Sequence, residues 1–269
     1  MSIFRHFQIA LRLAFKAKFS WMAIVVLLTV ALATLLSAYF GGRQPVTVAL
    51  DVGFSVMRLL LPLVIVLLVQ DLISREFDKR YYLNSLTYPD ARSNMLVGRC
   101  LAVSFLVLCL LFALGVLQVW LAGIISSVYP QATSVVLGQS YIIVMAFFWV
   151  DLLVLTGFSA VLAVFASTPS FVLVGTFGFM LVARSYGTII DLLGQGGELV
   201  SHAEGYRSAL GILSYFLPDL GALDVRMIAL YGKSNFLSSG WPWFILSNLA
   251  YAVAMLAFSV WLLQRKRFS

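Results

Sequence analysis

Residues 70–99 read QDLISREFDKRYYLNSLTYPDARSNMLVGR and form the largest polar block in the first half of the chain. Nine charged side chains fall within this block, and long apolar runs precede and follow it. Apolar runs of about 20 residues can cross the hydrocarbon core of a bilayer as helices. The block is therefore expected to lie at a water interface, between two membrane-spanning helices.

Composition places the whole chain in the membrane class. Of its 269 residues, 62% are hydrophobic and 11% are charged, whereas soluble domains carry about 25% charged residues. The net charge of +7 comes from basic residues near the ends of apolar runs, where they set topology. Cys100 and Cys109 would lie about 13 Å apart along one helix, too far for a disulfide. His6 and His202 stand alone, so no metal site is expected.

Before the first apolar run, residues 2–18 alternate basic and apolar side chains at helical spacing. This predicts a helix lying in the membrane interface, with Arg5, Arg12 and Lys16 facing anionic lipid. The alternative is an ordinary basic anchor without a helix of its own. The following run is longer than the core of a signal peptide, so a retained first span is expected.

The hydrophobic pattern predicts an all-α integral membrane protein with a single domain, residues 1–269. Its six spans are expected at about residues 21–40, 54–70, 95–125, 140–166, 170–190 and 242–264. Pro62 is acceptable within the second span because a neighbouring helix can bind the carbonyl that it frees. Lys and Arg gather on the side of both termini, which predicts that the N- and C-termini are cytoplasmic.

An outer connection, residues 191–241, joins the last two spans and is long enough to carry structure of its own. Its second part is amphipathic and is interrupted at Pro218. We expect two short helices hinged at Pro218 at the outer interface. The alternative, a seventh span, would place Asp219, Asp224 and Arg226 in the bilayer at considerable cost.

Three ionisable residues fall inside predicted spans: Arg58, Asp151 and Arg184. Asp151 and Arg184 differ in depth by only about 5 Å, within reach of an arginine side chain. One interpretation is a salt bridge between neighbouring helices. The other is that Arg184, helped by Arg58, faces a polar cavity and attracts an anionic group.

Sequence motifs of catalysis and nucleotide binding are missing. Neither H-E-x-x-H nor G-x-S-x-G occurs. Gly232-Lys233-Ser234 resembles the end of a phosphate-binding loop, but Met227 stands where that motif needs glycine. We therefore expect no catalytic residue, no metal and no cofactor bound by this chain.

Residues 71–92 of the polar block are expected to contain a short cytoplasmic helix, at residues 72–86. Glu76 and Arg80 have the favourable i, i+4 order, and the neighbouring tyrosines leave an aromatic surface suited to a partner's groove. A capped loop is the alternative.

Several motifs together resemble the permease subunits of six-helix, type-two ABC exporters. They are Ser74-Arg75-Glu76 after the second span, Pro89-Asp90-Ala91-Arg92, and Gly98-Arg99 at the start of the third. The outer stretch SYFLPDL, residues 214–220, is similar to the branch associated with multi-copper enzyme maturation.

The resemblance implies a bacterial inner-membrane permease that pairs with a second copy and with cytoplasmic ATPase subunits, which hold ATP and Mg²⁺. It implies a substrate path near Arg58, Asp151 and Arg184 and an amphiphilic or anionic substrate. The residues expected to contact the ATPase are Arg75, Glu76, Arg80, Tyr81, Tyr82, Leu83 and Arg92. The alternative function is a non-transporting membrane scaffold for a periplasmic or surface system. A secondary transporter is disfavoured, because the sequence has no internal repeat.

Overall fold

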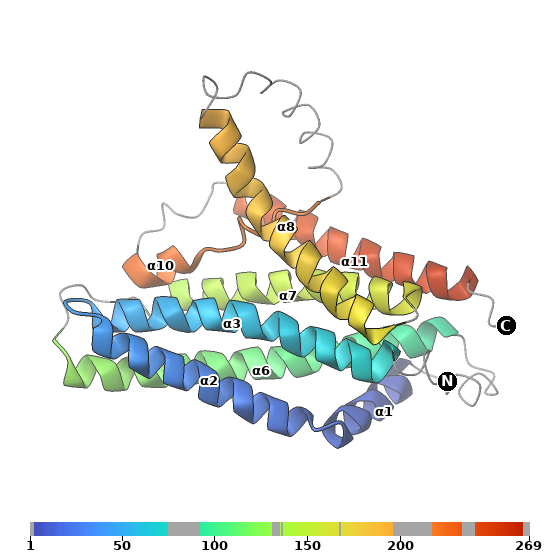
Figure 1. Cartoon of the computed structure of the whole chain (residues 1–269), viewed down its shortest axis with the longest axis horizontal. Coiled ribbons are helices and arrows are strands. Elements are labelled where there is room, and N and C mark those ends of the chain that lie inside the picture. The colour runs from blue at the N-terminus through green and yellow to red at the C-terminus, as the bar shows by residue number, and fades with distance from the viewer. Residues whose placement is uncertain are drawn as a thin grey trace.

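A computed structural model of the chain (Figure 1) describes residues 3–74, 92–130, 135, 137–166, 168–195, 217–232 and 240–265. Throughout these residues the regular elements are helices, and none of them belongs to a strand. The predicted all-α class is therefore confirmed.

Within the described residues, six helices are long and apolar enough to cross a membrane, as the sequence predicts. They are α2 (Phe19–Phe40), α3 (Pro45–Val69), α6 (Arg92–Val128), α7 (Gln139–Phe165), α8 (Pro169–Gln195) and α11 (Trp241–Arg265). By length and composition the chain is thus a multi-pass membrane protein.

Helix α3 begins at Pro45 rather than near residue 54, where the prediction began it. Proline is well suited to the first position of a helix, because the N–H that it lacks would have no partner there. The polar residues Thr47 and Asp51 interrupt the apolar pattern in the first two turns of α3. Thr47 is buried and Asp51 is partly exposed on the same helix.

The segment predicted to couple to a partner, residues 71–92, begins differently from the expectation. Residues Gln70–Ser74 continue α3 as a π-helical turn, with Leu72, Ile73 and Ser74 buried. A separate exposed helix therefore does not start at Leu72. Residues 75–91 lie outside the described residues, so most of the predicted coupling contacts do too. These are Arg75, Glu76, Arg80, Tyr81, Tyr82 and Leu83. Arg92 is the first residue of α6.

The predicted N-terminal helix is present as α1 (Ile3–Lys16), and it packs against α6. A Cβ atom on Gly98 would lie 2.7 Å from the Cβ of His6 and 3.0 Å from the carbonyl oxygen of Ile3. Glycine at this position therefore allows α1 to approach α6 closely. Apolar side chains of α1 such as Phe4 and Phe15 remain exposed, as an interfacial helix requires.

Figure 1 shows α2, α3, α6 and α7 running alongside one another, with α8 crossing obliquely over α3 and α7. Most of α3 and α7 is buried, including Phe54, Met57 and Leu155. α11 packs along α7, where Gly157 brings the two backbones together. A Cβ on Gly157 would lie 3.0 Å from the Ala252 carbonyl oxygen. The centre of the bundle is thus formed by α3 and α7.

Of the two short helices predicted on either side of Pro218, the first lies outside the described residues, and a single short helix follows Pro218. Residues 217–225 form bends and turns without regular secondary structure, and the one helix among residues 217–232 is the short α10 (Arg226–Tyr231). Helix α10 packs against α3 and α7. Six residues cannot span a bilayer, so α10 is not a seventh span.

Candidate functional site

Asp151 of α7 and Arg184 of α8 form an ion pair, with 2.6 Å between Nη2 of Arg184 and Oδ2 of Asp151. The Asp151 side chain is 4% exposed and that of Arg184 is 17% exposed. Of the two interpretations open from the sequence, the geometry is that of the salt bridge. It joins two consecutive helices in the interior of the bundle.

Arg184 also binds α3. Its Nη1 donates a hydrogen bond of 2.9 Å to the carbonyl oxygen of Arg58. In a regular helix this oxygen would accept from the residue four positions later, which is Pro62 and has no N–H. The neighbouring helix α8 thus binds the carbonyl that Pro62 frees, as the sequence predicts.

The side chain of Arg58 turns to residues 217–225 and not to a shared anion site with Arg184. Its Nη1 pairs with Oδ2 of Asp224, and its Nη2 donates to the Leu220 carbonyl oxygen at 2.7 Å. Both guanidinium groups, predicted as candidates for binding substrate, are therefore engaged within the chain.

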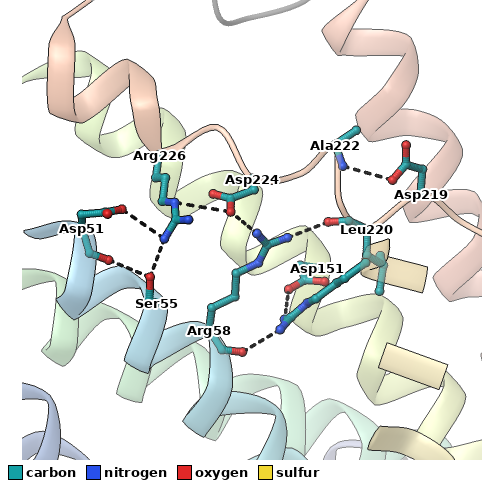
Figure 2. Close-up of polar contacts among 10 residues, drawn as sticks. Asp51, Ser55, Arg58, Asp151, Asp219, Leu220, Ala222, Asp224 and Arg226 are labelled. Carbon is teal, nitrogen blue, oxygen red and sulfur yellow. Dashed lines mark hydrogen bonds and ion pairs between the residues drawn. The ribbon is translucent and has the colours of Figure 1, made fainter. Parts of the chain in front are cut away.

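Arg226 extends these contacts toward the N-terminal end of α3 (Figure 2). It pairs with Asp51 at 3.1 Å and with Asp224 at 3.5 Å, and it donates to the hydroxyl of Ser55. None of these four residues was predicted as part of a site. Asp51, Ser55 and Arg58 share one face of α3 at spacings of four and three residues, and this pattern was the available signal. We call the set Asp51, Ser55, Arg58, Asp151, Arg184, Asp224 and Arg226 the charged network.

Close backbone contacts also hold residues 217–225 against α8. The amide of Leu220 donates to the Ala183 carbonyl oxygen at 3.1 Å, and Leu220 is fully buried. A Cβ on Gly221 would lie 2.6 Å from the Arg184 carbonyl oxygen. A Cβ on Gly187 would lie 2.6 Å from Oδ2 of Asp219. The segment can dock this closely because glycine is present on both sides.

Arg58, Asp151 and Arg184 lie deep in the bundle, whereas Ser55 is exposed and Asp51 is partly exposed. Arg58 is about 20 Å along α3 from Pro45 at 1.5 Å per residue. Irregular backbone at such depth is tolerated where protein buries it and binds its polar groups. The side chain of Arg58 and the carbonyl oxygen of Ala183 provide those contacts, and we call residues 217–225 the re-entrant segment of the bundle.

Hydrogen bonding within the charged network is incomplete. Four of its buried atoms have no hydrogen-bond partner in the part of the chain that the structure describes: Nε of Arg58, Nε of Arg184, Oδ1 of Asp151 and Oδ1 of Asp224. A partly satisfied buried network stabilises a fold less than a complete one. Stability alone is therefore a weak explanation for these seven side chains.

A second polar junction lies at the opposite end of α3, around the π-helical turn. Nη1 of Arg99, on α6, donates to the Leu72 carbonyl oxygen at 2.6 Å. Nε2 of Gln70 donates to the Pro169 carbonyl oxygen, at the start of α8, also at 2.6 Å. Arg99 is 5% exposed. This junction ties the end of α3 to α6 and α8 directly before residue 75.

Among the described residues, no three His, Cys, Asp or Glu side chains are grouped as metal ligands. Cys100 and Cys109 are free thiols, as their predicted spacing requires. Comparisons of the sequence with models of protein families and with curated proteins find no match.

Proposed function

We propose that this chain is the membrane-spanning subunit of an ABC exporter. It works with a second copy of itself and with a separate cytoplasmic ATPase that binds ATP and Mg²⁺. Both termini are cytoplasmic in this proposal, and the membrane is the bacterial inner membrane. The chain moves an amphiphilic substrate and carries out no chemistry of its own.

The observation that carries the proposal is the junction at the end of α3. The polar block that begins there is the segment that resembles a coupling helix. Through Gln70 and Arg99, the residues just before it are bonded to α8 and α6. A displacement applied at residue 75 would therefore act on three helices together, because these hydrogen bonds would have to break first, and the buried bond from the charged Arg99 is costly to break.

The charged network, farther along these helices, supports the same proposal. It links α3, α7 and α8 to residues 217–226 through side chains that are only partly satisfied. Discrete, partly satisfied polar contacts can exchange between two arrangements, which an alternating transport cycle requires. Because Arg58 and Arg184 are already paired, the proposal favours an amphiphilic substrate over a simple anion.

The test is purification of the tagged chain from its native membrane, followed by reconstitution into vesicles with any ATPase that accompanies it. We expect a co-purifying ATPase with a phosphate-binding loop, and ATP-dependent movement of a fluorescent amphiphile. Glu76→Ala and Tyr82→Ala should keep the complex intact but lower the amount transported per ATP hydrolysed. Arg43→Ala, in the exposed turn between α2 and α3, is the control.

Two results would overturn the proposal. If no ATPase associates with the chain, energy does not arrive through a partner. If a complex forms but no amphiphile moves with ATP, the alternative of a membrane scaffold is favoured.

A further inference from the structure

A cavity of about 380 Å³ opens between α8, α11 and the start of the re-entrant segment. Its lining residues are Tyr186, Leu217, Pro218, Asp219, Phe244, Ser247, Asn248 and Tyr251. Small-molecule sites occupy about 300–1,000 Å³, so the cavity has room for a headgroup and part of a chain. None of the seven residues of the charged network lines it.

The cavity is acidic. Asp219 contributes a carboxylate, and none of the described residues that line the cavity is basic. Oδ1 of Asp219 accepts a hydrogen bond of 3.1 Å from the Ala222 amide. The carboxylate forms no ion pair with any residue that the structure describes, and the nearby Arg184 is bound to Asp151. A carboxylate left without a cation inside a membrane protein is costly and attracts a cation.

Two polar side chains of α11 that line the cavity each donate a hydrogen bond within their own helix. The amide nitrogen of Asn248 and the hydroxyl of Ser247 both donate to the Phe244 carbonyl oxygen at 2.9 Å. Oδ1 of Asn248 has no hydrogen-bond partner among the described residues, and Asn248 is 2% exposed. Buried acceptors without partners favour a ligand that donates hydrogen bonds.

Aromatic rings form much of the remaining wall, from Tyr186, Phe244 and Tyr251. The faces of such rings attract organic cations. The ring of Tyr251 stacks with that of Phe179, with 6.5 Å between the ring centroids, and Phe179 stacks on Phe158 with 3.8 Å between the centroids. This stack joins α7, α8 and α11 on the side of the cavity nearer Pro169.

The cavity lies within reach of the apolar layer of a membrane. Asn248 is about 10 Å along α11 from Trp241, and Trp241 and Trp243 are both exposed at the start of that helix. Exposed tryptophans mark the boundary between headgroups and hydrocarbon. A ligand that reaches Asp219 from the lipid therefore needs an apolar chain as well as a charge.

We propose that this cavity binds the ammonium headgroup of an amphiphile. Asp219 pairs with the cation, the aromatic rings surround it, and the aliphatic chain lies between α8 and α11. The further claim that such an amphiphile is the transported substrate rests on the proposed function. Binding of the amphiphile itself requires no partner.

The test is titration of the purified full chain, in nonionic micelles, with dodecylammonium. Calorimetry should show saturable binding, weakened about tenfold by Asp219→Asn, as expected for loss of a charge-assisted contact. The asparagine keeps an oxygen for the Ala222 amide. Asp51→Asn removes a carboxylate outside the cavity and should leave the affinity unchanged. Dodecyl sulfate and dodecanol should bind at least about tenfold more weakly.

A second variant keeps the test decisive if Asp219→Asn does not fold. Ser247→Phe places a ring in the cavity from an exposed position of α11 and should abolish binding. Equal affinity in the wild type and in every folded variant would overturn the proposal. So would equal binding of dodecyl sulfate.

The source of the headgroup is found by competition. Nanodiscs of phosphatidylethanolamine should displace dodecylammonium if the ligand is a bilayer lipid, and nanodiscs of phosphatidylglycerol should not. If neither lipid displaces dodecylammonium, the ligand is a single-chain amine. If dodecylammonium does not bind but ATP-coupled transport is intact, this inference alone is overturned. If dodecylammonium binds but no ATP-dependent transport is found, the proposed function alone is overturned.

Discussion

At the scale of single residues, Pro62 and Arg184 illustrate how a membrane helix accommodates a proline. Pro62 removes the donor that Arg58's carbonyl would otherwise use, and Arg184 supplies a replacement from another helix. The same guanidinium neutralises Asp151. One side chain thus offsets both a backbone defect and a buried charge.

This geometry makes a quantitative prediction for Arg184→Ala. Asp151 would stay buried without its cation, which costs about 3–5 kcal/mol. Combining Arg184→Ala with Asp151→Asn removes the unpaired charge, so the double variant should be more stable than Arg184→Ala alone. Denaturant unfolding in detergent, analysed as a double-mutant cycle, measures this difference. Arg43→Ala, in an exposed turn, is the control, and additive effects would contradict the pairing.

A second residue-scale prediction concerns Gly221. Alanine would bring a Cβ within 2.6 Å of a backbone oxygen of α8, and overpacking of this kind costs about 1–3 kcal/mol. Gly178→Ala, in α8 itself, meets nothing within 4 Å and should be neutral or slightly stabilising. Thermal unfolding of both variants tests the docking of the re-entrant segment. Equal midpoints would show that the segment does not dock as described.

At the scale of elements, α1 packs closely against α6 at Gly98. Gly98→Ala should loosen α1, because the new methyl group meets backbone atoms of Ile3 and Phe7. Trypsin should then cleave faster after Arg12 and Lys16, which are exposed on α1. Gly123→Ala, in the same helix α6, has open space around it and provides the matched control. Unchanged cleavage of Gly98→Ala would indicate that α1 does not depend on this contact.

The π-helical turn is the other element with a testable role. Arg99→Ala leaves the Leu72 carbonyl oxygen without its charged donor, at a cost of about 1.5–3 kcal/mol. We expect a lower ratio of transport to ATP hydrolysis in reconstituted vesicles, with partial recovery in Arg99→Lys, which keeps a charged donor. Arg265→Ala, at the exposed end of α11, should be without effect. Normal coupling in Arg99→Ala would show that this junction does not transmit the energy of ATP hydrolysis.

At the scale of the whole molecule, the proposed topology can be measured directly. In a background without Cys100 and Cys109, a cysteine at Arg43 should react with a membrane-impermeant maleimide in intact cells. A cysteine at Lys16 should react only after permeabilisation. Both positions are exposed, so a difference between them reports the side of the membrane. The reverse pattern would invert the proposed orientation.

Predictions that depend on composition and periodicity hold in the structure. Among the described residues, the six helices able to span a membrane, the helical N-terminal segment and the two free cysteines each follow from the properties of one contiguous stretch. The bilayer imposes these properties locally, since each span must be apolar and must satisfy its own backbone. The start of α3 at Pro45 was missed because polar residues such as Thr47 face protein there instead of lipid.

The sequence by itself determined that this is an all-helical chain with six segments able to span a membrane, and that Asp151 and Arg184 lie at similar depth. Only the tertiary structure decided that Arg58 pairs with Asp224, that Arg226 joins Asp51, and that residues 217–225 enter the bundle. Hydropathy reports how a segment divides between water and lipid. Which buried charge meets which partner depends on packing between segments that lie far apart in the chain, and no local pattern encodes that packing.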